Sequence, residues 1–326
     1  MQETLEPYSG RRVLVTGGTG FIGLNLVEAL SRSRASLRVL SRSWPSPSPA
    51  ARRLFESVEF VKADIRDEVA VESAVKDVEV VFNLAGRSGA TVSNTSPLDD
   101  LDVNGRGQLT LLEACRKLAP RARVVFPSSR LVYRPGERLP VNEQAATGPL
   151  TIYGIHKLAA EHYHLLYRRS YDLPVVVLRV TNPYGPYQRE EQNRYGIVNW
   201  FIHLALKGAQ LPVYGDGAQL RDYVHVDDVV SALLLAGSCD AADGKVINIG
   251  SGEATSFLEM ANTIVHHAGA GGVQSVPWPA DASRVESGDF VADTSLAARL
   301  LRWQPRMRLD AGIADVIGRY RAAGPA

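Results

Sequence analysis

The 326-residue sequence predicts a doubly wound α/β fold, in which helices cover both faces of a parallel β-sheet. Three observations lead to this prediction. Short runs rich in β-branched residues alternate with helix-like segments through the first half of the chain, as is typical of parallel sheets. A glycine-rich turn follows the first of these runs, and the alternation stops at a turn-rich segment near residue 181.

The elements of the first half can be justified in chain order. Runs of valine, leucine and phenylalanine suit strands that are buried on both faces. Strands are expected at 11–17, 36–42, 58–64, 78–86, 122–129 and 173–182. The segments between them carry helical spacing of apolar residues, and helices are expected at 20–33, 69–77, 107–118 and 156–170.

The second half begins with "TNPYGPYQ" and mixes turns, helices and short strands. We expect residues 10–180 to form the first domain, to which residues 223–250 return. Residues 181–222 and 251–322 are expected to form a smaller C-terminal lobe over the carboxyl edge of the sheet, where ligands of doubly wound folds bind.

Composition excludes several classes of protein. Lysine plus arginine (36) nearly balance aspartate plus glutamate (35), which argues against a nucleic-acid surface. The apolar stretches are far shorter than the ~18 residues of a membrane span, and the first ten residues lack the apolar core of a signal peptide. The two cysteines lie far apart without metal-ligand spacing. We therefore expect a cytoplasmic protein with no nucleic-acid partner, no membrane association and no metal site.

The segment "VLVTGGTGFIG" predicts a dinucleotide-binding turn. Glycines 17, 20 and 23 lie three apart, directly after a strand and at the start of a helix. Glycine lets backbone N–H groups approach a pyrophosphate, and the helix N-terminus adds its positive end. The predicted contacts in this turn are Gly17, Thr19, Gly20, Phe21, Ile22 and Gly23.

The end of the second strand, "SRS", indicates which dinucleotide binds. An aspartate at Ser41 would accept hydrogen bonds from the adenosine ribose and would repel a 2′-phosphate. Instead, Arg42 can pair with that phosphate and Ser43 can donate a hydrogen bond to it. This favours NADP(H) over NAD, although Arg42 could also stack on the adenine of NAD.

Two further strand ends suit the same ligand. Asp64 and Ile65 close the third strand, where they could contact adenine. Leu84, Ala85 and Gly86 close the fourth, and the small Ala85 and Gly86 let backbone lie against a cofactor. Close helix packing would explain Ala85 or Gly86 equally well.

A candidate catalytic set stands in "YGIHK" and "VVFPSS". Tyr153 and Lys157 are four apart and share a helix face. A phenol has a pKa of about 10, and we expect the lysine ammonium to lower it towards the range of a useful acid–base catalyst. Ser129 supplies a hydroxyl that could hold a carbonyl oxygen.

Many motifs taken together resemble the extended short-chain dehydrogenase/reductases, the group of nucleotide-sugar epimerases and dehydratases. They are "TGGTGFIG", "NLAG", "DVNGRGQLTLLEAC", "SSRLVY", "YGIHK", "LRVTNPYGP", "VYGDGAQLRDYVHVDDVV", "INIGSG" and "ESGDFVADTSLAARLLRWQP". The resemblance implies a Rossmann-type first domain with Asn104 near the cofactor. It also implies a nucleotide-sugar-binding second lobe, the catalytic residues Ser129, Tyr153 and Lys157, and a homodimer. The dimer seam would form from apolar residues of "LTLLEAC" and "LAAEHYHLLY", although core packing accounts for much of the same pattern.

By the same resemblance, the substrate is a sugar carried on a nucleoside diphosphate. Guanidinium groups suit phosphate oxygens. Asn182, Arg221 and Arg284 match positions that bind the diphosphate or nucleoside. Arg87, Ser88, Ser129 and Arg130 are expected to face the sugar, although surface roles are open for Arg87 and Arg130.

The residues after Ser129 bear on the reaction. Dehydratases that resemble this chain carry Asp-Glu there, whereas this chain has Arg130 and Leu131, which cannot exchange protons for elimination. Because the second strand ends in an NADP-type pattern, we expect an NADPH-dependent 4-ketoreductase of a nucleoside-diphosphate 4-keto-6-deoxyhexose, with dTDP as the expected carrier. The alternatives are an NAD-dependent UDP-sugar 4-epimerase and a non-catalytic dinucleotide sensor.

Overall fold

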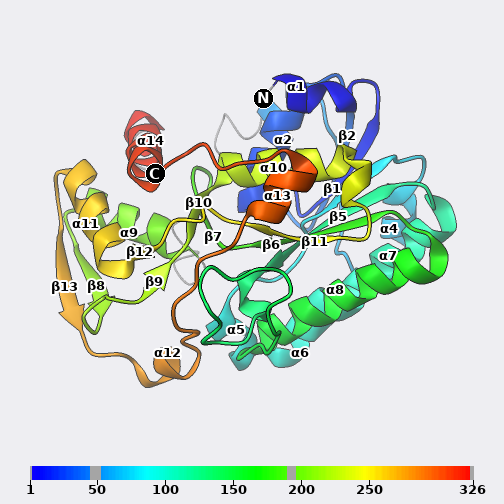
Figure 1. The fold of residues 1–326 in the computed structure, drawn as a ribbon. Coiled ribbons are helices and arrows are strands. Elements are labelled where there is room, and N and C mark those ends of the chain that lie inside the picture. Colours follow the sequence, from blue (N-terminus) through cyan, green and yellow to red (C-terminus); the bar gives the residue numbers. More distant parts are fainter. Residues whose placement is uncertain (1, 45–52, 189–195, 324–326) are drawn as a thin grey trace.

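The computed structural model describes residues 2–44, 53–188 and 196–323, and its centre is a parallel sheet of seven strands. The strand order is β11-β6-β5-β4-β1-β2-β3 (Figure 1). The strands are β1 (Arg12–Thr16), β2 (Ser36–Ser41), β3 (Glu59–Lys62), β4 (Val80–Asn83), β5 (Arg123–Ser129), β6 (Val175–Val180) and β11 (Val246–Ile249). The six strands expected in the first half are all present, and the predicted doubly wound α/β class is confirmed.

Helices cover both faces of this sheet. On one face lie α2 (Phe21–Ser31), α10 (Val226–Ser238) and α13 (Ser295–Leu301), and on the other lie α4 (Glu68–Val75), α7 (Gly107–Leu118) and α8 (Ile152–Tyr171). The alternation of strand side chains explains why each face needs a cover. In β1, Val13 and Val15 enter the core of the first face, whereas Leu14 enters the core of the second.

A smaller lobe with its own core lies beside the sheet, on the left of Figure 1. It contains α9 (Ile197–Leu206), β8 (Gln210–Tyr214), α11 (Phe257–Ala268), β13 (Gly272–Val276) and α14 (Leu309–Ala323). Within the predicted range 251–322 of this lobe, α13 and Trp303 pack instead in the core of the large sheet. β13 pairs with β8 in parallel, and the core of the lobe includes Phe201, Leu211, Met260 and Ile313.

Short elements complete the described part of the chain. They are the helices α1 (Gln2–Leu5), α5 (Ala90–Thr95), α6 (Pro97–Leu101) and α12 (Ala280–Arg284), the 3-10 turns Glu6–Tyr8, Arg130–Val132 and Asp240–Ala242, the π-helical turn Asp102–Arg106, and the strands β7 (Asn182–Tyr184), β9 (Leu220–Arg221), β10 (Tyr223–His225) and β12 (Thr255–Ser256). Among the described residues, every helix is too short or too polar to cross a membrane.

Buried polar groups join the lobe to the sheet. The fully buried Asp222 carboxylate accepts backbone hydrogen bonds from Ser251, Gly252 and Ala292. Asp228, near the start of α10, accepts hydrogen bonds from the backbone N–H groups of Arg306 and Met307, each at 3.0 Å. Because these acceptors hold distant segments of the chain, they fix the path of the C-terminal region across the sheet.

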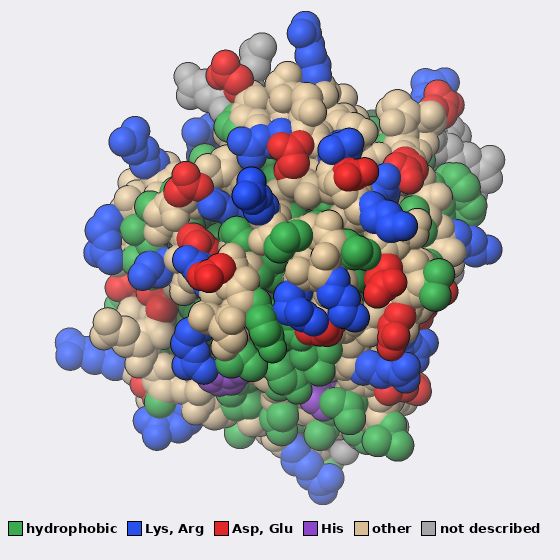
Figure 2. All heavy atoms as spheres, turned by 90° about the vertical axis from the view of Figure 1, so that its right-hand side faces the viewer, with side chains coloured by type: hydrophobic (Ala, Val, Ile, Leu, Met, Phe, Trp, Pro, Cys, Tyr) green, Lys and Arg blue, Asp and Glu red, His purple; other side chains and the backbone are tan. Residues whose placement is uncertain are grey.

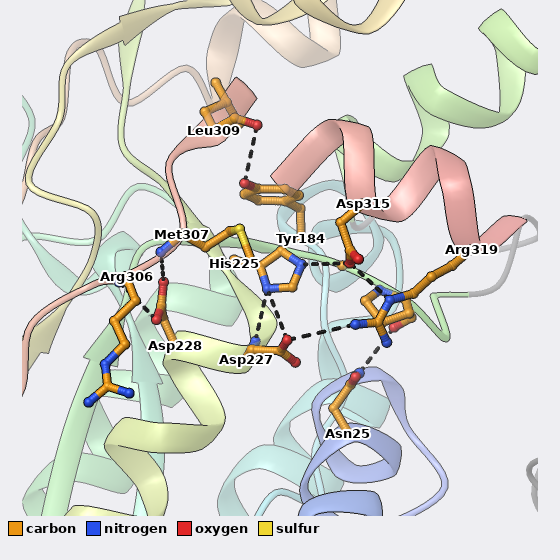
Figure 3. Close-up of polar contacts among 12 residues, drawn as sticks. Asn25, Tyr184, His225, Asp227, Asp228, Arg306, Met307, Leu309, Asp315 and Arg319 are labelled. Carbon is orange, nitrogen blue, oxygen red and sulfur yellow. Dashed lines mark hydrogen bonds and ion pairs between the residues drawn. The ribbon is translucent and has the colours of Figure 1, made fainter. Parts of the chain in front are cut away.

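The start of α10 also contacts the last helix (Figure 3). His225 caps α10, because its Nδ1 accepts a hydrogen bond from the Asp227 backbone N–H. Its Nε2 lies 4.0 Å from a carboxylate oxygen of Asp315 in α14, and that carboxylate pairs with Arg319 at 2.9 Å. These contacts place α14 beside β10.

Candidate active site

A cleft of about 960 Å³ crosses the carboxyl ends of β2 to β6. Residues from the glycine turn, the strand ends, α8 and the segment around Asn182 line it. Of the predicted site residues, those that line the cleft are Gly17, Thr19, Gly20, Phe21, Ile22, Gly23, Ser41, Arg42, Ser43, Asp64, Ile65, Leu84, Ala85, Gly86, Arg87, Ser88, Ser129, Arg130, Tyr153, Lys157, Asn182 and Arg221. Asn104 and Arg284, the other two of the predicted set, do not line it.

The glycine turn has the geometry that a pyrophosphate requires. Gly17 adopts a positive φ of 67°, and a Cβ there would lie 2.9 Å from the Ala85 backbone. A Cβ on Gly23 would lie 2.3 Å from the Gly17 carbonyl oxygen. Gly20 begins α2 without a side-chain cap, so that the first N–H groups of the helix have no side-chain acceptor. These residues therefore fit a nicotinamide dinucleotide.

The end of β2 places a serine where an adenosine ribose is expected. The buried Ser41 hydroxyl lies 2.8 Å from the Thr19 hydroxyl, whereas Arg42 is exposed. Hydrogen bonds from Arg66 lower the pKa of Asp64, and the charge of Arg42 adds to this effect. Arg42 is therefore close enough to influence a charged group at the adenosine end of the cleft.

Asn104 acts behind the cleft wall rather than in it. Its side chain accepts a hydrogen bond from the Arg87 N–H and donates one to the Arg87 carbonyl oxygen, both at 3.0 Å. It also donates to the buried Asp100, whose carboxylate lies 2.7 Å from His156 Nδ1. Asn104 thus links the segment after Gly86 to α8, and its predicted place in the cofactor site stays a prediction.

The three residues predicted to be catalytic line the same cleft, and their catalytic role stays a prediction. Ser129 ends β5. Thr151 caps α8 and so fixes the first turn of the helix that carries Tyr153. Lys157 lies one turn further, where its ammonium donates to the Pro127 carbonyl oxygen at 2.9 Å.

The structure does not show the predicted lowering of the Tyr153 pKa by the Lys157 ammonium. Burial raises the pKa of Tyr153, and only the Ser129 hydrogen bond opposes that rise. Burial also lowers the pKa of Lys157 to about 8. The Lys157 nitrogen lies 5.9 Å from the centre of the Tyr153 ring and 4.5 Å from that of Phe126. The expectation is wrong here because the ammonium is directed at Pro127 and Phe126 rather than at the phenolic oxygen.

Three arginines surround the other end of the cleft. The Arg130 guanidinium donates to the Asn182 side-chain oxygen at 3.2 Å and to the Ser287 hydroxyl at 2.9 Å. The buried Arg221 donates to the carbonyl oxygens of Leu220 and Gly288, and it pairs with the Glu286 carboxylate. Arg87 pairs with Asp99 at 3.0 Å.

Arg284 lies apart from the cleft, and its predicted role in substrate binding stays a prediction. It ends α12, is exposed and lies outside the lining of the cleft. The sequence placed it near the loop that contains Glu286 and Ser287 but could not show which residue of the loop turns inward. Glu286 and Ser287 do so, and they contact the two arginines of the cleft.

Several lining residues escaped the sequence analysis. Ser128, Val180 and Thr181 lie at the ends of β5 and β6, and the rule that ligands bind at strand ends could have identified them. Among the described residues, the buried Ser128 hydroxyl has no hydrogen-bond partner, as expected for a group that faces a ligand. Gln188 and Gly196–Val198 come from a segment whose fold no local signal indicates.

Comparisons with known proteins identify the family of this chain. A family model described as "NAD dependent epimerase/dehydratase family" matches residues 13–250. UDP-glucose 4-epimerase of Mycolicibacterium smegmatis is 35% identical over 317 residues, which cover 95% of this chain and 98% of that protein.

Solved structures show the same likeness. The structure of UDP-glucose 4-epimerase with UDP-glucose from Thermotoga maritima has a TM-score of 0.86 and 30% identity, and the match covers 95% of this chain and 99% of that one. The Thermus thermophilus UDP-glucose 4-epimerase complex with NAD has a TM-score of 0.84 and 31% identity, covering 96% and 99%. The fold, the glycine turn, the Ser-Tyr-Lys set and these matches lead to one conclusion: the chain belongs to the NAD-dependent epimerase/dehydratase family and is an enzyme of the extended short-chain dehydrogenase/reductase type.

Proposed function

We propose that the protein is a nicotinamide-dependent 4-epimerase of a nucleoside-diphosphate hexose, with a UDP-hexose as the preferred substrate class. The observation that carries this proposal is that Ser129, Tyr153 and Lys157 line one cleft, which begins at the phosphate-binding turn. The near full-length likeness to UDP-glucose 4-epimerases supports the choice of reaction.

The residues of the chain have distinct roles in this proposal. Tyr153, acting as a phenolate, takes the proton of the sugar C4 hydroxyl as the ketone forms and returns it as the alcohol reforms. Because burial raises the pKa of Tyr153, this role requires that the positive charges of Lys157 and of an oxidised nicotinamide favour the phenolate in the complex. Ser129 hydrogen-bonds the same oxygen and orients it, while Lys157 holds the ribose next to the nicotinamide. A dinucleotide held by the glycine turn would accept a hydride from C4 and return it. Return to the opposite face of the ketone would invert the centre without net use of cofactor.

Elimination chemistry finds no support in the site. Arg130 and Leu131 follow Ser129, and neither side chain can move a proton between carbon and oxygen at neutral pH. The alternative of a non-catalytic dinucleotide sensor is disfavoured because such a protein needs no hydrogen-bonded serine and tyrosine pair.

A second candidate, the NADPH-dependent 4-ketoreductase expected from the sequence, rests on one specific observation. At the end of β2, Ser41 pairs with Thr19, Arg42 is exposed, and residues 41–43 include no carboxylate. This arrangement suits a 2′-phosphate better than an aspartate would. The relatives from M. smegmatis and T. maritima are epimerases, and the T. thermophilus epimerase is a complex with NAD. This likeness favours the epimerase over the reductase.

We infer that the protein is a homodimer through α7 and α8. Figure 2 shows hydrophobic side chains gathered on the face at the right of Figure 1, where these helices lie. Leu118, Leu166 and Tyr171 are 40–50% exposed there. Exposed apolar residues on two adjacent helices are typical of an interface. We further infer that residues 10–180 with 223–250 form the dinucleotide-binding unit, and that 181–222 with 251–322 form the substrate lobe.

One experiment separates the two candidate reactions. Purified protein is tested for retained dinucleotide and then incubated with UDP-glucose, UDP-N-acetylglucosamine and a dTDP-hexose without added cofactor. The epimerase predicts C4 inversion by NMR and no net change in cofactor absorbance. Steady oxidation of added NADPH by a dTDP-4-keto-6-deoxyhexose, without C4 inversion of the other sugars, would establish the reductase instead.

A further inference from the structure

Arg130 holds an unusual position between the reacting end and the diphosphate end of the cleft. Its backbone follows Ser129 directly, and Ser129 hydrogen-bonds the Tyr153 phenol. Its guanidinium, by contrast, reaches Asn182 and Ser287 and lies 5.5 Å from the centre of the Phe290 ring. The side chain therefore runs from the expected site of the sugar C4 oxygen to the expected site of the diphosphate.

Arg130 differs from Arg87 and Arg221 in the charge of the groups that it contacts. Arg87 pairs with Asp99, and Arg221 pairs with Glu286 and two carbonyl oxygens. In the described part of the chain, the Arg130 guanidinium contacts an amide oxygen, a hydroxyl and an aromatic ring, all of them neutral.

The surroundings of Arg130 favour an incoming anion. Burial and the nearby positive charge of Arg221 lower the pKa of Arg130 to about 10, and the carboxylates of Glu286 and Asp222, which are not hydrogen-bonded to it, oppose this shift; Arg130 remains protonated at neutral pH. A partly buried guanidinium without a carboxylate partner gains most from an anion that the substrate itself brings.

We propose that Arg130, together with Asn182, binds the β-phosphate of the nucleotide sugar, the role that Arg284 was expected to fill. This inference deepens the proposed function and rests on it for the nature of the substrate. The hexose then lies along the Arg130 side chain, with C4 at Ser129 and its anomeric phosphate at the guanidinium.

This placement has a consequence for epimerisation. Inversion requires the 4-ketohexose to present first one face and then the other to the nicotinamide, so contacts with the sugar must change. A charge-assisted contact with the diphosphate can persist throughout this change. Arg130 thus retains the substrate while the sugar turns.

The test measures nucleotide binding rather than turnover. Calorimetry on the wild-type protein selects the tightest binder among UDP, dTDP, CDP and GDP, and the corresponding monophosphate is then compared with it. We expect Arg130→Gln to weaken the diphosphate by roughly 10- to 100-fold, the range for loss of hydrogen bonds to a charged group, and to change the monophosphate much less. Arg130→Lys should restore part of the preference.

A matched control is Arg134→Gln, because Arg134 is an exposed arginine outside the cleft that pairs with Glu137. It should bind both nucleotides as the wild type does, and circular dichroism checks that each variant is folded. An unchanged preference for diphosphate over monophosphate in folded Arg130→Gln would overturn the proposal. So would loss of UDP-glucuronate binding with UDP binding retained, because Arg130 would then recognise a sugar carboxylate.

The same measurement separates this inference from the proposed function. If C4 inversion is never observed but Arg130→Gln loses its diphosphate preference, the role of Arg130 stands and the reaction assignment fails. If no nucleoside diphosphate binds the wild type, both fail.

Discussion

Replacement of Lys157 by methionine tests whether this candidate catalytic lysine is desolvated in the folded protein. The Lys157 side chain is only 8% exposed, and burial lowers its pKa from 10.5 to about 8. A pKa difference of this size corresponds to ~3 kcal/mol of stability. Between about pH 8 and pH 10.5 the unfolded chain binds the proton that the folded protein has released, so the contribution of Lys157 to stability rises with pH.

The assay is urea unfolding of wild-type and Lys157→Met protein, both freed of dinucleotide, at pH 7 and pH 10. At pH 7 the buried Lys157 is mostly protonated, and its desolvated charge destabilises the folded wild type. At pH 10 the folded protein holds Lys157 mostly neutral, so this destabilisation is largely removed. The difference in the free energy of unfolding, wild type minus variant, should therefore be about 2–3 kcal/mol larger at pH 10 than at pH 7. A difference between the two proteins that does not change with pH would refute this account of Lys157.

The remaining predictions concern catalysis, cofactor choice, stability and assembly. Tyr153→Phe should lower kcat by roughly 10²- to 10⁴-fold, the usual share of a proton-transferring group, with dinucleotide still bound on titration; wild-type turnover would refute its role. Ser41→Asp should weaken NADP(H) relative to NAD by roughly 10-fold or more in fluorescence titrations, because the carboxylate repels a 2′-phosphate; an unchanged ratio would show that the phosphate lies elsewhere. Asp228→Asn should lower the free energy of unfolding by about 1–3 kcal/mol, since one of the two partly buried backbone N–H groups that bind this carboxylate loses its acceptor, and an unaltered urea midpoint would contradict this. Leu166→Glu should shift the protein from dimer to monomer in light scattering, and a monomeric wild type would refute the α7–α8 interface.

The sequence predicted six of the seven strands of the large sheet, and it missed β11 as a strand. The valine-rich runs of β1, β5 and β6 are buried on both faces, and such runs leave little choice of structure. Most of the cleft followed from the same elements, because parallel strands bring their carboxyl ends to one edge. Ser41, Asp64, Leu84 and Ser129 come from four separate strands and still line one cleft.

The parts that could not be predicted depend on contacts between distant segments. The pairing of Arg130 with Ser287, and the outward position of Arg284, follow from the path of a loop with no local signature. Burial raises the pKa of Tyr153, and the four-residue spacing of Tyr153 and Lys157 does not reveal how deeply the phenol is buried. Asn104 was predicted to lie near the cofactor. Its hydrogen bonds with the Arg87 backbone could be identified only from the folded structure.

The most direct test of the account uses a UDP-hexose that carries deuterium at C4. The purified protein, without added cofactor, should convert it to the C4 epimer, and NMR should find the deuterium still at C4 of the product. This result requires hydride removal and return at one carbon within a single site formed by Ser129, Tyr153 and Lys157. Loss of the deuterium to solvent, or a product that keeps its original C4 configuration, would contradict the proposed chemistry.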